Sequence, residues 1–185
     1  MTEKTVFAGF GGQGIISLGQ IWVYCGMKEG KNVSFFPFYG AEKRGGIARA
    51  NCIVSDTAIA SPVITRPNSV VIMNQDSLAL GLSLLTKSGL LISNSSLVSL
   101  DTEASEKITQ TGIRLVQIPA TEIAEKLGNA KIANMVMLGA LAHQTGALSL
   151  EKVESILKSF FPESKHRFIP MNVTAIKEGM HIESK

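Results

Sequence analysis

A glycine-rich turn near the N-terminus constrains this chain more than any other feature. A short apolar run at residues 5–8 leads directly into Gly9-Phe10-Gly11-Gly12-Gln13-Gly14-Ile15, and a helical pattern of apolar residues follows. Glycines permit such a tight turn because they tolerate positive φ angles and leave space for close approach. Backbone N–H groups at the start of a helix attract anions, so the arrangement predicts a phosphate-binding turn between a strand and a helix.

Strand-like and helix-like patterns alternate along most of the chain. Short apolar runs predict strands at residues 5–8, 32–36, 47–54, 70–73, 90–93 and 115–118. Apolar residues at helical spacing predict helices at residues 15–27, 133–141 and 150–161, with others capped by Asn74 and Thr121 and a last one from Asn172. The alternation predicts an α/β fold with a Rossmann-like, mostly parallel sheet and helices on both faces. Residues 47–54 follow another strand without an intervening helix, so some antiparallel pairing is expected, and Pro37 is expected to end the second strand.

Length and composition exclude several classes of protein. The chain has 185 residues and shows no repeat or low-complexity linker, which favours a single domain over residues 1–185. A net charge of +3 and only 6% aromatic residues argue against a nucleic-acid partner. No uncharged apolar run reaches the about 18 residues that span a bilayer, and no secretory segment is visible. We therefore expect a cytoplasmic protein without a membrane span.

The cysteines and histidines give no sign of a metal site. Cys25 and Cys52 are the only cysteines, too few to hold an iron–sulfur cluster or a structural zinc ion. Both lie in apolar patterns, and we expect two buried free thiols. His143, His166 and His181 show no ligand spacing, so exposed or helix-end positions are expected for them.

The glycine turn fits a dinucleotide-binding motif only in part. Gly9, Gly11 and Gly14 match G-x-G-x-x-G, but no acid ends the second strand, about 20 residues on, to bind the ribose. Glu29 belongs to the preceding helix pattern, and no Lys-Ser/Thr pair follows the turn as in a Walker loop. Two interpretations stay open: the glycines serve only close packing, or the turn recognises a ligand. Gly12 and the amide of Gln13 favour recognition, because a purely steric turn does not need them.

A second polar segment fits neither a helix nor a strand. It reads Tyr39-Gly40-Ala41-Glu42-Lys43-Arg44-Gly45-Gly46. The guanidinium of Arg44 suits a carboxylate or a phosphate, and the glycines would let a partner's backbone approach. The functional interpretation is a contact site for a ligand or another subunit. The alternative is a solvated loop with an Arg44–Glu42 pair, which would contribute little stability.

Together these two segments resemble the gamma subunit of 2-oxoacid:ferredoxin (acceptor) oxidoreductases. Three later pieces agree with the family in the same order: Ser61-Pro62, the run Asn134-Met135-Val136-Met137-Leu138-Gly139-Ala140-Leu141, and Asn172-Val173-Thr174-Ala175 with Gly179. The resemblance covers nearly the whole chain. The form of the 39–46 segment resembles stand-alone gamma subunits of 2-oxoglutarate enzymes, with the pyruvate and branched-chain or indolepyruvate forms as close relatives.

The resemblance implies an accessory role in a larger enzyme. Such complexes convert a 2-oxoacid and coenzyme A to an acyl-CoA and carbon dioxide and pass electrons to ferredoxin. They use thiamine diphosphate, Mg²⁺ and iron–sulfur clusters, with alpha, beta and ferredoxin-like delta subunits as partners. This chain has no thiamine signature, so no catalytic or metal-binding residue is expected, and coenzyme A is a candidate ligand. The expected ligand or subunit contacts are Gly9, Gly11, Gly12, Gln13, Gly14, Tyr39, Gly40, Glu42, Arg44, Gly45 and Gly46.

Two other hypotheses stay open beside this one. The chain is a free-standing nucleotide-binding oxidoreductase that uses the Gly9–Gly14 turn, or it is a purely structural scaffold subunit in which both glycine segments serve packing.

Overall fold

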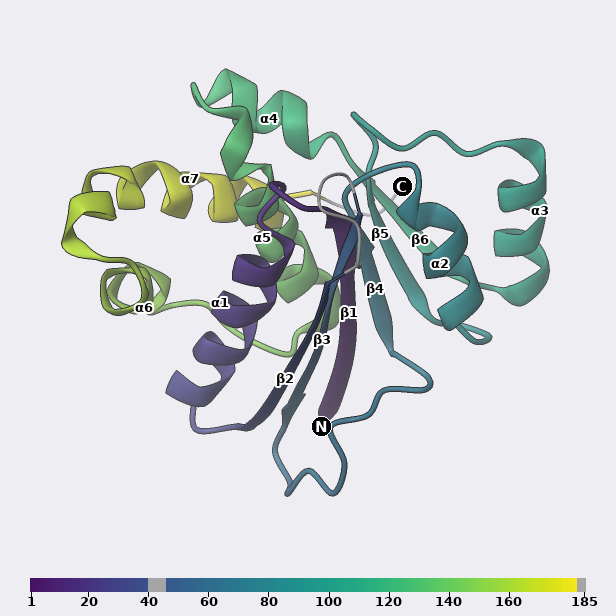
Figure 1. Ribbon diagram of the computed structural model, residues 1–185, viewed down its shortest axis with the longest axis horizontal. Helices are drawn as coiled ribbons and strands as arrows, with labels where there is room; N and C mark the ends of the chain where they lie inside the picture. Colours follow the sequence, from purple (N-terminus) through teal and green to yellow (C-terminus); the bar gives the residue numbers. More distant parts are fainter. Residues whose placement is uncertain (40–45, 183–185) are drawn as a thin grey trace.

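A mixed sheet forms the centre of the molecule (Figure 1). The computed structural model describes residues 1–39 and 46–182. The sheet has six strands in the order β2-β3-β1-β4-β5-β6. Strands β1, β4, β5 and β6 run parallel to one another, whereas β3 is antiparallel to both β1 and β2. The predicted α/β class and its mixture of parallel and antiparallel pairing are therefore confirmed.

The strands and helices follow the predicted alternation. The strands are β1 (Thr2–Phe10), β2 (Asn32–Tyr39), β3 (Ile47–Ser55), β4 (Ser69–Ile72), β5 (Leu90–Asn94) and β6 (Arg114–Ile118). The α-helices are α1 (Ile15–Lys28), α2 (Ser77–Leu84), α3 (Thr102–Thr111), α4 (Ala120–Lys126), α5 (Ala133–Thr145), α6 (Val153–Phe160) and α7 (Ile169–Met180). Short 3₁₀ turns at Ala130–Ile132 and Glu163–Phe168 precede α5 and α7.

Helices cover the two faces of the sheet unequally. Helices α1, α5, α6 and α7 lie on one side of it, and α2 and α3 lie on the other (Figure 1). The larger core, on the α1 side, includes fully buried Phe7 and Trp22. The smaller core, on the α2 side, joins Val6, Val70 and Leu82. Both predicted cysteines are buried free thiols, Cys25 in α1 and Cys52 in β3.

Several local predictions were wrong, each for a physical reason. Pro37 does not end β2, because β2 is an edge strand and tolerates a residue without an N–H. Helix α7 begins at Ile169, with Pro170 in its first turn, where the missing N–H costs nothing. Helix α3 was not predicted, because few of its residues are apolar and only Ala104 and Ile108 are buried.

The two predicted helix caps, Asn74 and Thr121, are not N-caps in the structure. Asn74 lies before the N-cap of α2, which is Asp76, and its side-chain oxygen accepts a hydrogen bond from the Ser77 hydroxyl at 2.5 Å. Thr121 lies inside α4, whose N-cap is Pro119. The Thr121 hydroxyl instead accepts a hydrogen bond from the amide of Asn94 at 2.9 Å. Both side chains thus fix loops at the carboxyl edge of the sheet.

Helices α5 and α7 make an unusually close contact. Every residue of α5 from Ala133 to Ala142 is buried, so the helix lies inside the protein rather than on its surface. A methyl group added to Gly139 would collide with the carbonyl of Ile176, and one added to Gly179 would collide with the carbonyl of Val136. The two backbones touch because neither glycine has a side chain. These glycines belong to the two C-terminal sequence motifs, and the role of the two glycines is close packing.

Candidate functional site

The glycine turn follows the carboxyl end of β1 and lies beside the carboxyl end of β4. Helix α1, which follows β1, and helix α2, which follows β4, pack on opposite faces of the sheet. In open α/β sheets, ligands bind outside the strand ends at such a switch point. Here the side chain of Gln13 bridges that position: its oxygen accepts the N–H of Phe10 at 2.8 Å, and its nitrogen donates to the carbonyl of Met73 at 3.0 Å.

The hydrogen bonds of Gln13 sharpen its predicted role. A donor and the acceptor of its amide are engaged with the protein's own backbone, and they tie the turn to the end of β4. The side chain therefore has a structural task. Contact between Gln13 and a ligand or another subunit stays a prediction.

The glycines of the turn differ in what requires them. A methyl group at Gly9 would lie 2.7 Å from both Gln13 Oε1 and Ile15 Cδ1, and one at Gly14 would collide with the amide of Asn134. Gly12 and Gly14 have φ angles of 101° and 74°, which favour glycine. Gly11 has neither constraint, since its φ is outside the left-handed region and no described residue lies within 4 Å of an added methyl group. The described fold thus explains Gly9, Gly12 and Gly14, and leaves Gly11 unexplained.

The structure brings the separate sequence motifs together around this turn. The N–H of Gly11 donates to the carbonyl of Gly46 at 3.4 Å, so the second motif ends beside the first. The amide of Asn134, at the start of α5, donates to the carbonyl of Gly14 at 3.4 Å. Tyr39 ends β2. The predicted contacts Gly40, Glu42, Arg44 and Gly45 lie outside the described residues, so neither interpretation of Arg44 is tested.

A hollow of about 230 Å³ opens beside the start of α1. Its polar lining contains two lysines, Lys131 and Lys165, and no carboxylate among the described lining residues. The described part of α1 has no side-chain cap at its N-terminus, so its first N–H groups are free of such a partner. The helix dipole and the two ammonium groups both favour an anion here. The full lining is Gly14, Ser17, Asn129, Lys131, Ile132, Asn134, Met135, Phe161, Lys165, Phe168 and Asn172.

Sequence reasoning did not find these lysines. Lys131 comes from the turn before α5, and Lys165 comes from the turn before α7. Nothing in their local patterns distinguishes them from other surface lysines. Only the packing of α5 against α1, and of α7 against α5, places both beside the glycine turn.

The dinucleotide interpretation does not fit this geometry. In dinucleotide-binding folds the second strand lies next to the first, so that its terminal acid reaches the ribose. Here β3 lies between β1 and β2. Glu29 is also engaged elsewhere: its carboxylate accepts the N–H groups of Ser149 at 3.1 Å and Leu150 at 3.2 Å. Glu29 therefore stabilises the turn before α6.

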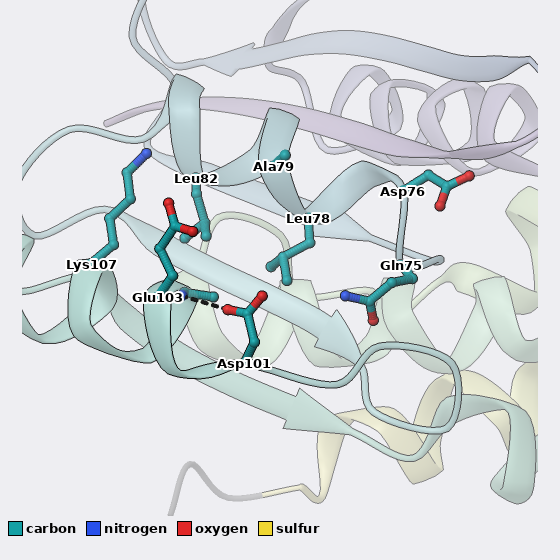
Figure 2. A pocket seen from close by; sticks show the side chains of 9 residues that line it. Gln75, Asp76, Leu78, Ala79, Leu82, Asp101, Glu103 and Lys107 are labelled. Carbon is teal, nitrogen blue, oxygen red and sulfur yellow. Dashed lines mark hydrogen bonds between the residues drawn. The ribbon is translucent and has the colours of Figure 1, made fainter.

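A second hollow, of about 310 Å³, lies between α2 and α3 (Figure 2). Apolar Leu78 and Leu82 form its floor, and Glu103 and Lys107 stand at its edge. None of the predicted contact residues that the structure describes lines it. Asp101 caps α3 through the N–H of Ala104 at 2.8 Å, and Gln75 is bonded to the backbone of Ser99. These polar side chains therefore hold the two loops in place.

The two cysteine thiols are buried and are not activated as nucleophiles. Burial, with a smaller contribution from Glu29, raises the pKa of Cys25 to about 12, and burial also raises the pKa of Cys52. Burial raises the pKa of Glu3, although hydrogen bonds from Ser69 and Thr5 oppose it. No group of three or more His, Cys, Asp or Glu side chains within residues 1–39 and 46–182 could hold a metal ion. Over the same ranges, no helix is long and apolar enough to cross a bilayer.

The sequence itself now places this fold in a family. The family model described as "Pyruvate ferredoxin/flavodoxin oxidoreductase" matches residues 4–182. The chain belongs to this family. Within the pyruvate ferredoxin/flavodoxin oxidoreductases it corresponds to the gamma subunit, as the resemblance of its motifs indicated.

Relatives with known names differ in length and in the oxoacid they are named for. The 2-oxoglutarate synthase subunit KorC of Methanothermobacter marburgensis is 32% identical over 188 residues, covering 98% of this chain and 97% of its own. The ketoisovalerate oxidoreductase subunit VorA of Methanothermobacter thermautotrophicus is 33% identical over 177 residues. That match covers 95% of this chain, but this chain spans only 35% of VorA.

A solved structure agrees with the fold over nearly the whole length. It is the gamma subunit of a keto/oxoacid ferredoxin oxidoreductase from Geobacter sulfurreducens, with a TM-score of 0.80 and 26% identity. The match covers 97% of this chain and 95% of the other. The sheet and helices around the glycine turn are therefore those of a gamma subunit in this family.

Proposed function

We propose that this chain is the accessory gamma subunit of a thiamine-dependent 2-oxoglutarate:ferredoxin oxidoreductase in the cytoplasm. The reaction takes 2-oxoglutarate and coenzyme A to succinyl-CoA and carbon dioxide, and the released electrons reduce ferredoxin or a similar acceptor. The observation that carries the choice of oxoacid is the end-to-end match with KorC, whereas the match with VorA covers only part of that subunit.

The redox and thiamine chemistry belongs to partner chains in this proposal. The two thiols are buried with raised pKa values, so they do not suit cluster ligation. The described residues also hold no cluster of metal ligands for Mg²⁺. Within residues 1–39 and 46–182, the two buried thiols and the lack of a carboxylate cluster therefore offer no ligand set for an iron–sulfur cluster or Mg²⁺. The alpha and beta subunits, with a ferredoxin-like delta subunit, would supply them.

Coenzyme A is the ligand that we propose for the hollow beside the glycine turn. Its phosphates are anionic, and the hollow combines the start of α1 with Lys131 and Lys165. Replacing both lysines with glutamine should raise the KM for coenzyme A in the assembled enzyme and leave the KM for the oxoacid unchanged. An unchanged KM for coenzyme A would show that coenzyme A does not bind in this hollow.

Reconstitution tests the main proposal. The isolated chain should give no dye reduction that depends on a 2-oxoacid, and the complex with its partner subunits should give it. Among 2-oxoglutarate, pyruvate and 2-oxoisovalerate, the complex should show the highest kcat/KM with 2-oxoglutarate. Activity of the isolated chain would overturn the accessory role, and a preference for another oxoacid would overturn the substrate alone.

The two other hypotheses have their own tests. A free-standing nucleotide-binding enzyme should bind NAD or FAD tightly in calorimetric titration of the isolated chain. The position of β3 and the hydrogen bonds of Glu29 disfavour that outcome. A purely structural scaffold predicts that Gln13→Ala and Arg44→Ala change stability or assembly, but not the kinetics of the assembled enzyme.

A further inference from the structure

The hairpin formed by β2 and β3 has one face covered by α1 and an opposite face, called the open face, that is exposed at Phe36 and Phe38. Helix α1 packs on the covered face, where Val33 and Phe35 join the larger core. Side chains alternate along a strand, so Phe36 and Phe38 point to the opposite face. There α2 packs against β4 and β1. Phe36 is 47% exposed and Phe38 is 36% exposed, whereas Phe7 in β1 is fully buried.

The open face carries an organised cluster rather than scattered apolar residues. The rings of Phe36 and Phe38 lie 4.8 Å apart, and the guanidinium of Arg49 lies over the Phe38 ring at 4.0 Å. Arg49 is paired directly with Phe38 across the two strands. We call Phe36, Phe38 and Arg49 the aromatic patch. Aromatic residues and arginine are the side chains most enriched at the energetic centres of protein interfaces.

Polar atoms on the same face lack partners within the described part of the chain. The Nε atom of Arg49 is buried and makes no hydrogen bond there. Asn51, which pairs with Phe36 across the strands, is 6% exposed, and its side-chain oxygen also has no partner. A buried polar atom without a hydrogen bond costs free energy, but both atoms are covered by the protein's own atoms, so a docked segment would meet the outer nitrogens of the Arg49 guanidinium rather than Nε. The stacked guanidinium of Arg49 can offer its edge to a carboxylate while its plane stays on the ring.

The charge of Arg49 and the position of Pro37 argue against a second copy of this chain as that partner. A symmetric contact would place the same patch on both sides and bring one Arg49 toward the other, which is electrostatically unfavourable. Pairing through the outer edge of β2 is also hindered, because Pro37 lies in the middle of that strand without an N–H. A different chain with a negative charge avoids both problems.

We propose that the aromatic patch is the docking surface for an acidic, apolar segment of another subunit of the complex. An apolar side chain of that segment covers Phe36 and Phe38, and an Asp or Glu next to it binds Arg49. This inference rests on the proposed function only in naming the partner as a subunit of the same enzyme. It is separate from the hollow at the start of α1.

Photocrosslinking in the assembled complex tests the contact directly. p-Benzoylphenylalanine replaces Phe36 in one preparation and Leu97, which is 46% exposed in the loop after β5, in the matched control. The Phe36 probe should crosslink to one peptide of a partner subunit that contains an Asp or Glu, and the Leu97 probe should not reach that peptide. A crosslink to a second copy of this chain, to a peptide without a carboxylate, or to no protein in an assembled complex would overturn the proposal.

A charge exchange gives a second, independent measurement. Arg49→Glu should weaken binding of the partner subunits by about tenfold or more, and Phe36→Ser should weaken it to a similar extent. Leu97→Ser should leave binding unchanged, and circular dichroism should show that all three variants are folded. Changing the crosslinked acid of the partner to arginine should restore binding to Arg49→Glu. Failure of that rescue would exclude the ion pair.

The outcomes separate this inference from the proposed function. If the wild-type complex assembles and oxidises 2-oxoglutarate but Arg49→Glu binds as tightly as wild type, the docking surface is wrong and the proposed function stands. If the wild-type chain binds no oxidoreductase subunit at all, both are wrong.

Discussion

The glycines of the turn after β1 and the glycines between α5 and α7 meet opposite surroundings. Gly139 and Gly179 face the backbone of the opposite helix, where an added methyl group has no space. At Gly11 and Gly12, by contrast, no described residue lies within 4 Å of an added methyl group. Both pairs of glycines belong to sequence motifs that resemble those of the gamma-subunit family. Similar sequence signals therefore have different physical causes in the two regions.

The two regions therefore need glycine for different physical reasons. The α5–α7 glycines are explained completely by the contact between the helices. The turn contains mixed cases: Gly14 is required by both its φ angle and Asn134, Gly12 by its φ angle alone, and Gly11 by neither. The less the described fold requires a glycine, the more its presence points to a contact beyond the described residues. Substitution by alanine can order these positions by stability.

The largest loss of stability is expected at the helix contact. Gly139→Ala should lower the free energy of unfolding by about 3 kcal/mol, because the new methyl group meets the rigid backbone of α7. Urea denaturation measures the change. The control is Glu178→Ala, an exposed position on α7 that should alter stability by no more than about 0.5 kcal/mol. A Gly139→Ala protein as stable as wild type would show that this contact is not tight.

A smaller loss is expected at the start of α1. Gly14→Ala should cost about 2 kcal/mol, since it combines a φ angle of 74° with a collision against the Asn134 amide. Asn134→Ala removes the colliding group, so the double mutant should be more stable than the sum of the single mutants predicts. Simple additivity in thermal or urea unfolding would mean that the two residues do not interact.

Backbone strain alone is expected at Gly12. Gly12→Ala should cost about 1 kcal/mol, because φ is 101° and no neighbour obstructs the methyl group. Gly30→Ala is the matched control, since Gly30 also has a positive φ of 81° and open space but lies at the other end of α1. The two variants should lose similar amounts of unfolding free energy. If only the Gly12→Ala variant then shows a kinetic defect in the assembled enzyme, the turn contacts a ligand or another subunit. If the two variants show the same kinetics, backbone strain alone explains the glycine at position 12.

The smallest change in stability, and the most informative one, is expected at Gly11. Gly11→Ala should change the unfolding free energy by less than about 0.5 kcal/mol, since neither φ nor packing requires glycine there. If a ligand or subunit approaches the turn, the same variant should raise the KM for coenzyme A or weaken assembly by about tenfold. Wild-type behaviour in both assays would place the partner elsewhere.

Much of the fold could be predicted because its signals are local. The turn follows a strand and precedes a helix in the sequence, and α5 is apolar on every side. The missed helix α3 shows the limit of the apolar pattern. Its signals were of another kind, with Asp101 as N-cap and Gly112 after its last turn at a φ of 65°. The prediction that Pro37 ends the second strand was wrong for a related reason, because only the strand order shows that β2 is an edge strand.

The sequence alone determined the glycine turn, the α/β alternation and the family, since each depends on residues that are neighbours along the chain. The tertiary structure decided how those residues are used. Only the pairing of β1 with β4 engages Gln13 with Met73, and only the packing of α5 brings Asn134 to Gly14. The order of the strands likewise decides that Phe36, Phe38 and Arg49 share an open face. These contacts join residues far apart in sequence, and no local pattern encodes their distances.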